Sequence, residues 1–175
     1  MELTKAINER RSIRQYQPYE ITEDEINELI RCANLAPSWK NSQTARFFVA
    51  LSEEYKAKIV DALPDFNKER AGTASCVIVT AIKTGVSGYT SRGSTHLGNG
   101  FECFDNGLAV QNLVLRAYDM GLGTLIMGLY DEKKVREVFE IPEEYAVCAL
   151  VAVGKADICP DMPERMAIKD ISVIK

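Results

Sequence analysis

Three arginines and a serine fall within five residues near the start of the chain, at Arg10, Arg11, Ser12 and Arg14. Guanidinium groups match the oxygen atoms of a phosphate in geometry and charge, and a hydroxyl adds one more donor. The cluster could therefore bind a phosphorylated ligand. A structural interpretation is also open, because a short helix is expected from Leu3 to about Glu9, and cations near a helix C-terminus interact favourably with its dipole.

A second polar cluster is the loop of residues 37–43, whose candidate ligand-binding residues are Pro37, Ser38, Trp39, Asn41 and Gln43. Amide side chains both donate and accept hydrogen bonds, which suits the polar edge of a heterocycle. The same composition is typical of a turn held by local side-chain bonds. Trp39, the single tryptophan, could cover a flat ligand or fill a gap in the core.

Further candidates lie toward the C-terminus. A strand is expected from Thr124 to Leu129, and Gly128 interrupts it, which often marks a bulge or the close approach of a ligand. Lys155 and Arg165 add cations near the end of the chain. A ligand with a phosphate and a hydrogen-bonding ring would use all of these groups.

The element expected to organise the others is a helix from Asp105 to Gly123, apolar from Leu108 to Met120. Asp105 is the expected N-cap, and the glycines at 121 and 123 are a stop signal. The outward polar residues are expected to form one narrow stripe. Nearly the whole circumference must then be buried, which predicts the central helix of the core and leaves a role in a subunit interface open. The stripe comprises Asp105, Asn112, Arg116 and Asp119.

The remaining pattern predicts helices over 22–36, opened by a Thr22–Glu25 capping box, over 52–63, and after an Asp131 cap. Strands are expected at 46–51, 75–82 and 145–153. Residues 65–70 are charged and only weakly periodic. This mixed order favours an α+β fold over a doubly wound sheet.

Two segments lack regular periodicity. Residues 84–100 contain five glycines and are expected to be a functional or mobile loop, a candidate lid. The single histidine, His96, either faces a substrate there or is an exposed loop residue. The tail, about 156–175, is expected to dock on a neighbouring subunit through Ile171, Val173 and Ile174.

Bulk properties exclude several classes of protein. A formal charge of −4 argues against nucleic-acid binding, and one histidine argues against a histidine-rich metal site. The five cysteines form no C-x-x-C pair, which indicates neither a zinc site nor a disulfide framework and fits a reducing cytoplasm. Neither a signal peptide nor a membrane-spanning segment is expected.

The sequence resembles the flavin-dependent nitroreductases of the short, minimal type over nearly its whole length. The resemblance rests on four motifs in the same order. They are Arg10-Arg11-Ser12-x-Arg14, Ala36-Pro37-Ser38-x-x-Asn41-x-Gln43, the 105–123 helix ending Met120-Gly121-Leu122-Gly123, and Gly154 with Arg165.

The resemblance implies an α+β fold with a central, mostly antiparallel sheet flanked by helices. It implies an intertwined homodimer in which residues 1–175 form a single FMN-binding domain, with one FMN per subunit at the dimer interface. NADH or NADPH would reduce the FMN, and a small electrophile such as a nitroaromatic or a quinone would then take the electrons. The flavin would carry the chemistry, so no catalytic side chain is expected.

The resemblance also assigns the cofactor-binding residues. Arg10 and Arg14, with Ser12, would hold the phosphate and the polar flavin edge, and Arg165 would add a phosphate contact. The 37–43 loop would line the flavin, in part that of the partner subunit, and backbone near 127–128 would lie beside the reactive N5. The full candidate set is Arg10, Arg11, Ser12, Arg14, Pro37, Ser38, Trp39, Asn41, Gln43, Ile126, Met127, Gly128, Lys155 and Arg165.

Three residues or pairs depart from the family pattern. Thr44-Ala45 replaces a frequent Pro-Trp, and Met127 stands where some relatives have Glu; both changes touch the expected pocket and leave the substrate open. Pro163 stands where many relatives have Lys, which is expected to weaken the phosphate contacts modestly. Two other functions remain alternatives. One is a non-catalytic module that binds flavin or another nucleotide. The other is a flavin enzyme with different chemistry, such as ene reduction, reductive dehalogenation or flavin breakdown.

Overall fold

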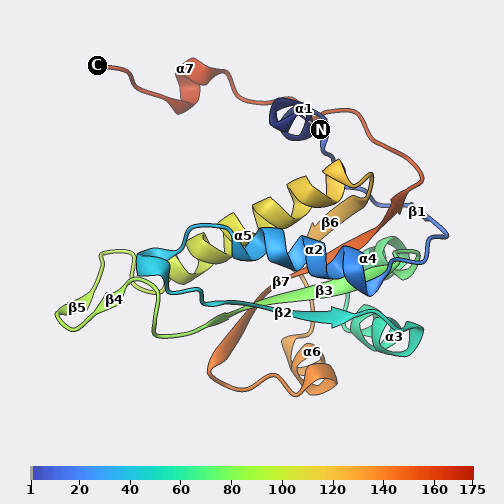
Figure 1. Cartoon of the computed structure of the whole chain (residues 1–175), viewed down its shortest axis with the longest axis horizontal. Helices are drawn as coiled ribbons and strands as arrows, with labels where there is room; N and C mark the ends of the chain where they lie inside the picture. The colour runs from blue at the N-terminus through green and yellow to red at the C-terminus, as the bar shows by residue number, and fades with distance from the viewer. Residues whose placement is uncertain (1) are drawn as a thin grey trace.

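The computed structural model describes residues 2–175; Met1, the first residue of the expected domain, lies outside them. A five-stranded antiparallel sheet forms the centre of the described chain, with helices on both faces (Figure 1). The predicted α+β fold is confirmed. The strands are β1 (Tyr16–Gln17), β2 (Ala45–Ala50), β3 (Cys76–Lys83), β6 (Gly123–Met127) and β7 (Tyr145–Ala156).

Strand β7 is the central strand of the sheet. It pairs with β3 along one edge, and with β6 and the short β1 along the other, while β2 completes the sheet beyond β3. Strand β3 is buried on both faces, as its nearly continuous apolar sequence predicts. The sheet therefore contributes side chains to two separate cores, one on each face.

One face of the sheet is covered by α2 (Glu23–Asn34) and α5 (Gly100–Asp119). Leu29 of α2 and Leu113 of α5 are fully buried there against β7. The capping box predicted at the start of α2 is confirmed, because the Thr22 hydroxyl and the Glu25 carboxylate each accept a hydrogen bond from the other residue's backbone amide. Burial of these apolar stripes holds α2 and α5 on the sheet.

The other face is covered by α3 (Glu53–Asp61), α4 (Asp65–Gly72) and α6 (Glu132–Phe139). Ser52 and Asp131 accept hydrogen bonds at the starts of α3 and α6, as predicted. Helix α4 was not expected, because its sequence is charged and only one short turn of it, around Ala71, reaches the core. Tertiary contact overrides the weak local pattern there.

Helix α5 corrects two predictions. It begins at Gly100, so Asp105 is not the N-cap but a buried residue one turn inside the helix. The prediction that the polar stripe faces outward is also wrong, because Asp105 is buried and Asn112 and Arg116 contact α2. Arg116 donates to Glu28 at 2.8 Å and Asn112 donates to the Cys32 carbonyl at 3.2 Å. Polar pairing across the helix contact, which the sequence of one helix does not reveal, explains both differences.

A different stripe of α5 faces outward, formed by Phe104, Gly107 and Gln111. Phe104 is 57% exposed. An apolar ring on the open face of a core helix leaves room for a further packing partner.

The irregular segments also differ in part from expectation. Residues 84–100 contain a small hairpin of β4 (Tyr89–Thr90) and β5 (Gly93–Ser94), and His96 beside it is exposed. Strand β6 ends at Met127, so Gly128 follows the strand and does not interrupt it.

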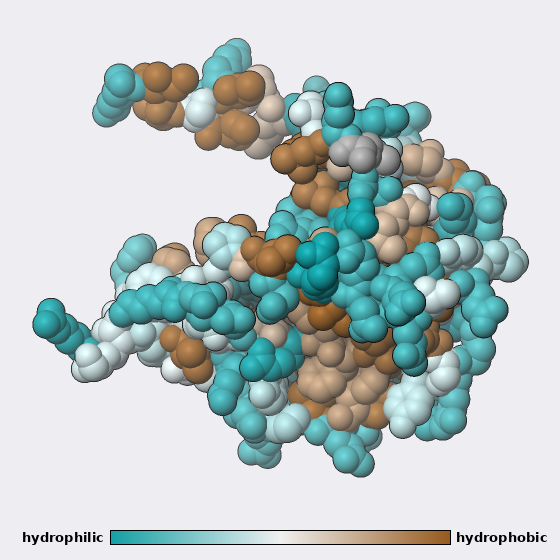
Figure 2. All heavy atoms as spheres, in the orientation of Figure 1, coloured by the Kyte–Doolittle hydropathy of each residue, from teal (hydrophilic) through white to brown (hydrophobic). Residues whose placement is uncertain are grey.

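A short 3-10 turn, η1 (Trp39–Asn41), forms within the 37–43 loop, and α1 (Leu3–Glu9) matches its prediction. The tail beyond β7 contains α7 (Ile168–Ile171) and stands away from the body with its apolar side chains exposed (Figure 2). Among residues 2–175, no helix is both long and apolar enough to cross a bilayer.

Candidate functional site

Arg10 and Arg11, near the start of the sequence, and Arg165, near its end, lie close together beside α1. Burial, and then the positive charges of Arg11 and Arg165, lower the pKa of the Arg10 guanidinium below its ordinary value. Arg165 belongs to the tail, which passes over α1 (Figure 1). Arg11 is fixed by donating to the Asn8 carbonyl at 2.7 Å. Clustered like charges repel, so this arrangement favours the binding of an anion.

An open cavity of about 450 Å³ lies next to the same segment, within the usual range for small-molecule sites. Ser12 and Arg14 line one side of it, and Arg70 of α4 lines the other. The 12–13 segment is held in place because the Ile13 amide donates to the Thr124 carbonyl of β6 at 2.9 Å. The remaining lining residues are Gln15, Glu69, Ile158 and Pro160.

Arg70 was missed by sequence reasoning because α4 was missed. Its guanidinium donates to the Asn67 side chain at 3.4 Å and lies 5.3 Å from the centre of the Phe66 ring. The detectable signal was Pro64 followed by Asp65, a proline and an acidic residue at a helix start, with a basic residue in the last turn. With Arg14, Arg70 is the second cation that lines the cavity.

The 37–43 loop is strained. Lys40, Asn41 and Gln43 have φ of 47°, 55° and 48°, a left-handed conformation that costs non-glycine residues on the order of 1–3 kcal/mol each. Besides the backbone bonds of the turn, two hydrogen bonds to side-chain oxygens help to maintain it. The Gln43 amide donates to the Ser38 hydroxyl at 3.0 Å, and the Trp39 amide donates to Asp105 at 2.9 Å. Such strain is typical of a segment shaped to meet a ligand.

Polar atoms within this loop and at Thr44, directly after it, are buried without a partner in the described chain. They include the indole N–H of Trp39 and the hydroxyl oxygens of Ser42 and Thr44. The Trp39 ring packs against Phe101 with ring centres 4.7 Å apart. Buried polar atoms normally have hydrogen-bond partners, so their concentration here is compatible with a polar ligand edge.

The loop and the arginines lie at opposite ends of α5. Asp105 holds the loop near the helix start, whereas Tyr118, near its end, donates to Glu9 of α1 at 2.8 Å. At 1.5 Å per residue these two anchors are about 20 Å apart along the axis. Accordingly, the 450 Å³ cavity includes no residue of the 37–43 loop. The structure brings Arg10, Arg11 and Arg165 together, but does not bring the loop to them within one chain.

The end of β6 presents an open backbone. Met127 is buried, whereas Ile126 is 49% exposed and Gly128 is exposed. A Cβ added at Gly128 would have no atom within 4 Å. A flat ligand can therefore approach this backbone closely. Lys155 lies elsewhere, with its ammonium 5.9 Å from the centre of the Tyr19 ring.

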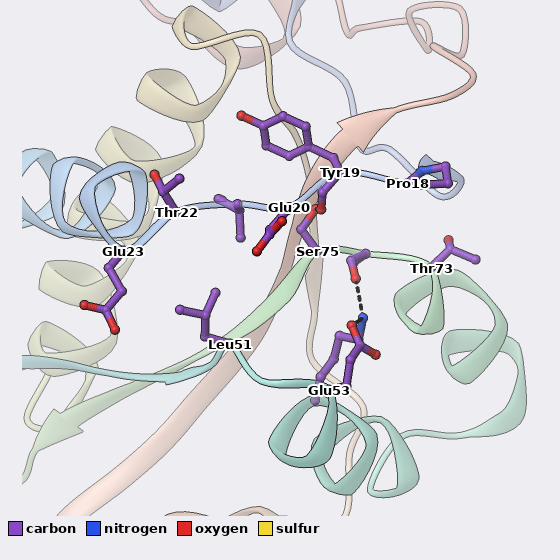
Figure 3. Close-up of a pocket in the computed structure, with 12 residues that line it drawn as sticks. Pro18, Tyr19, Glu20, Thr22, Glu23, Leu51, Glu53, Thr73 and Ser75 are labelled. Carbon is purple, nitrogen blue, oxygen red and sulfur yellow. Dashed lines mark hydrogen bonds and ion pairs between the residues drawn. The ribbon is translucent and has the colours of Figure 1, made fainter.

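A larger open cavity, about 650 Å³, lies between the 18–23 segment and the start of α3 (Figure 3). Its charged lining residues are Glu20, Glu23, Glu53 and one cation, Lys56. The Lys56 ammonium is already engaged, because it donates to Glu53 at 2.7 Å and to the Ala74 carbonyl at 2.9 Å. The excess of carboxylates makes this cavity unsuitable for a phosphate. No cluster of metal-ligating side chains occurs within residues 2–175.

Comparisons with known proteins identify relatives of this chain. The family model described as "Nitroreductase family" matches residues 7–155. An Archaeoglobus fulgidus protein named "Putative NADH dehydrogenase/NAD(P)H nitroreductase" is 31% identical over 87% of this chain and 84% of its own. A Bacillus subtilis protein named "Putative NAD(P)H nitroreductase YdgI" is 30% identical over 89% of this chain and 88% of its own.

A solved structure extends the likeness to three dimensions. The crystal structure of a protein from Exiguobacterium sibiricum, titled a putative nitroreductase in complex with FMN, aligns with a TM-score of 0.88 and 25% identity. The alignment covers 100% of this chain and 98% of that one. Sequence motifs, sheet topology and the family match therefore agree, and the chain belongs to the nitroreductase family.

Proposed function

We propose that this protein is an FMN-dependent oxidoreductase that takes electrons from NADH or NADPH and passes them to a small electrophile, such as a nitroaromatic or a quinone, in two separate steps. The names of the Archaeoglobus and Bacillus relatives and the FMN in the Exiguobacterium structure support this activity. The observation in this chain that carries it is the arginine cluster beside the 450 Å³ cavity.

The residues present suit FMN. Arg10, Arg11 and Arg165 would hold the phosphate, because crowded guanidinium groups gain most from a dianion. Ser12, Arg14 and Arg70 would contact polar atoms nearer the ring system. Backbone at 126–128, open at Gly128, would lie beside the ring.

FMN, when bound, supplies the hydride chemistry, and the protein supplies position and electrostatic field. Cations such as Arg14 and Arg70 near the ring favour its anionic reduced form and so raise its reduction potential. No acid, base or nucleophile among the side chains is needed for this role. The open Gly128 backbone leaves one face of the site free for NAD(P)H and then for the electrophile.

A second copy of the chain would complete the site. The arginines and the strained loop are about 20 Å apart along α5, so an antiparallel partner could bring its own 37–43 loop to these arginines. The outward stripe at Phe104, Gly107 and Gln111 offers a contact face. The exposed apolar tail residues, including Ile171, Val173 and Ile174, would dock on the partner. Residues 1–175 would thus act as a single FMN-binding domain in a homodimer.

The test begins with the visible spectrum of the purified protein, before and after addition of FMN and gel filtration. A colourless protein that does not retain FMN contradicts the proposal. Bound FMN that is bleached by NADH or NADPH and reoxidised by a nitroaromatic or a quinone supports it, with parallel lines in double-reciprocal plots expected for the two-step scheme. Bound FMN that stays oxidised favours a non-catalytic binding module. Product analysis separates nitro and quinone reduction from ene reduction, dehalogenation and flavin breakdown.

A further inference from the structure

Strand β7 contains a bulge at Cys148. In the register with β3, Thr80 pairs with Ala149 and Ala81 pairs with Val147, so Cys148 is the extra, unpaired residue. A bulge changes the direction in which neighbouring side chains point. This irregularity determines the face of the sheet on which the Cys148 thiol lies.

The core contacts identify that face. Before the bulge, Tyr145 and Val147 pack against the core beneath α3, α4 and α6; after it, Leu150 and Ala152 pack against the same core. Val147 and Leu150 are three residues apart yet face the same core, so alternation breaks once between them. With the break between Cys148 and Ala149, Cys148 lies on the opposite face, which α5 covers.

Helix α5 crosses the sheet at the bulge. The Asn106 amide donates to the Thr80 hydroxyl at 3.3 Å, and that hydroxyl donates to the Ala149 carbonyl at 3.2 Å. Cys103 lies three residues before Asn106 and so on the same side of α5. The helix therefore places the Cys103 thiol over Cys148.

The electrostatics of the two thiols agree with this placement. Burial first, and then the adjacent Cys103 thiol, raise the pKa of Cys148 to about 12. Cys103 is exposed, whereas Cys148 is half-buried. An exposed thiol in contact with a less accessible one is the arrangement of an attacking and a resolving cysteine.

We propose that Cys103 and Cys148 form a reversible intramolecular disulfide. The Cys103 thiolate attacks one sulfur of a low-molecular-weight disulfide, which breaks the S–S bond and releases one small thiol. The Cys148 thiol then loses its proton and attacks the Cys103 sulfur, displacing the second small thiol. The two cysteines lose two electrons and two protons, and the small disulfide gains both to become two thiols. This step is independent of the proposed flavin chemistry.

The bond would fasten the first turn of α5 to β7. Asp105, two residues beyond Cys103, holds the Trp39 amide and the Ser87 hydroxyl, so the cross-link would restrain the helix end that supports the loop and the hairpin. Cys103 lies four residues before Gly107 and therefore at the edge of the Phe104, Gly107 and Gln111 stripe.

The experiment treats the full-length protein with oxidised glutathione, blocks free thiols in denaturant, and maps tryptic peptides without reduction. Peptides 93–116 and 137–155 each contain one cysteine, Cys103 and Cys148 respectively. We expect the two peptides to be joined, two of the five thiols to be lost, and dithiothreitol to restore both.

Variants identify the order of attack. In Cys148→Ala we expect a glutathione adduct retained on Cys103, and in Cys103→Ser no adduct and no cross-link at Cys148. Cys159→Ser, which removes another exposed thiol, should leave the cross-link unchanged. A wild-type protein that keeps glutathione on Cys103 while Cys148 stays free, or that forms only disulfides between chains on a non-reducing gel, would overturn the proposal.

Discussion

The backbone amide of Trp39 donates a 2.9 Å hydrogen bond to the buried carboxylate of Asp105, which also accepts a hydrogen bond from the Ser87 hydroxyl. One side chain of α5 thus holds both the strained 37–43 loop and the segment leading into the β4–β5 hairpin. The carboxylate of Glu102, one turn earlier, accepts from the Val86 amide at 3.2 Å and reinforces the second contact. The loop and the hairpin are therefore mechanically linked through α5.

Asp105→Ala should lower the free energy of unfolding by about 1–3 kcal/mol, because it leaves a buried amide and a hydroxyl without their acceptor. It should also weaken FMN binding, since the strained loop loses its anchor. Urea denaturation and flavin fluorescence titration measure the two effects. Thr90→Ala, which removes a hydroxyl bonded only within the hairpin, is the matched control. Equal effects of the two substitutions would show that the Asp105 contacts are not specific anchors.

Arg165→Ala should weaken FMN binding roughly 10- to 150-fold, the equivalent of about 1.5–3 kcal/mol for a charge-assisted contact. Binding of riboflavin, which lacks the phosphate, should change little, because Arg165 is expected to contact only that group. Isothermal titration with both flavins gives the comparison. Lys169→Ala removes another exposed tail cation and should leave both affinities unchanged. A parallel loss of riboflavin binding would place Arg165 near the ring instead.

Arg14→Ala tests the side of the site facing the cavity. We expect FMN retention to fall while the melting temperature of the flavin-free protein stays within a few degrees. The Arg14 guanidinium is exposed and donates a hydrogen bond to the nearby Ser12 carbonyl, so its loss should cost little stability. Absorbance of the purified protein measures flavin content, and calorimetry measures melting. Unchanged flavin content with a lower melting temperature would instead assign Arg14 a structural role.

Substitutions at Gly123 and Gly128 should distinguish effects on stability from effects on FMN binding. A Cβ at Gly123 would lie 2.6 Å from Ile13, so Gly123→Ala should destabilise the protein by about 1–3 kcal/mol. A Cβ at Gly128 would meet no atom within 4 Å, so Gly128→Ala should leave stability nearly unchanged and weaken FMN binding by crowding the ring. Thermal denaturation without flavin and titration with flavin provide the two readouts. If Gly128→Ala kept full FMN affinity, the flavin would not lie against this backbone.

The sequence predicted the parts of the fold that depend on local patterns. The caps at Thr22, Ser52 and Asp131 and the apolar strands are visible without tertiary information. The role of Asp105 was not predictable from the sequence. A carboxylate near a helix start has the same local signature whether it caps the helix or binds a distant amide. Arg70 was missed for a related reason: α4 is held by tertiary packing more than by its own pattern.

The candidate site was only partly predictable. The arginines near position 10 were found as a cluster, but their proximity to Arg165 depends on the path of the tail over α1. The 37–43 loop was identified by its amides and hydroxyls, whereas its left-handed backbone at Lys40, Asn41 and Gln43 has no glycine signature. The loop and the arginines occupy opposite ends of α5, and only the three-dimensional structure shows this.

Acid stability should depend on Glu28. Its carboxylate accepts from Arg31 at 2.6 Å and from Arg116 at 2.8 Å, and these hydrogen bonds, Arg31's first, lower the pKa of Glu28 from 4.5 to about 2. The unfolded chain binds this proton at the higher pKa, so the stabilisation is present above about pH 4.5 and is lost as the pH falls toward 2. Glu28→Gln should reduce the change in the free energy of unfolding between pH 2 and 6, as measured by urea denaturation at each pH. Glu143→Gln should leave this pH dependence unchanged.

Complementation between inactive chains tests whether one site draws on two copies. A chain with Arg10→Ala and Arg165→Ala lacks the phosphate contacts, and a chain with Ser38→Ala and Asn41→Ala lacks the loop side chains; each homodimer should retain little FMN. Heterodimers formed by co-expression contain one site with both sets intact. Random pairing of two chains in a twofold dimer should therefore restore about one quarter of the wild-type flavin sites. No recovery, despite heterodimers shown by differential tags, would mean that each chain binds its flavin with its own residues.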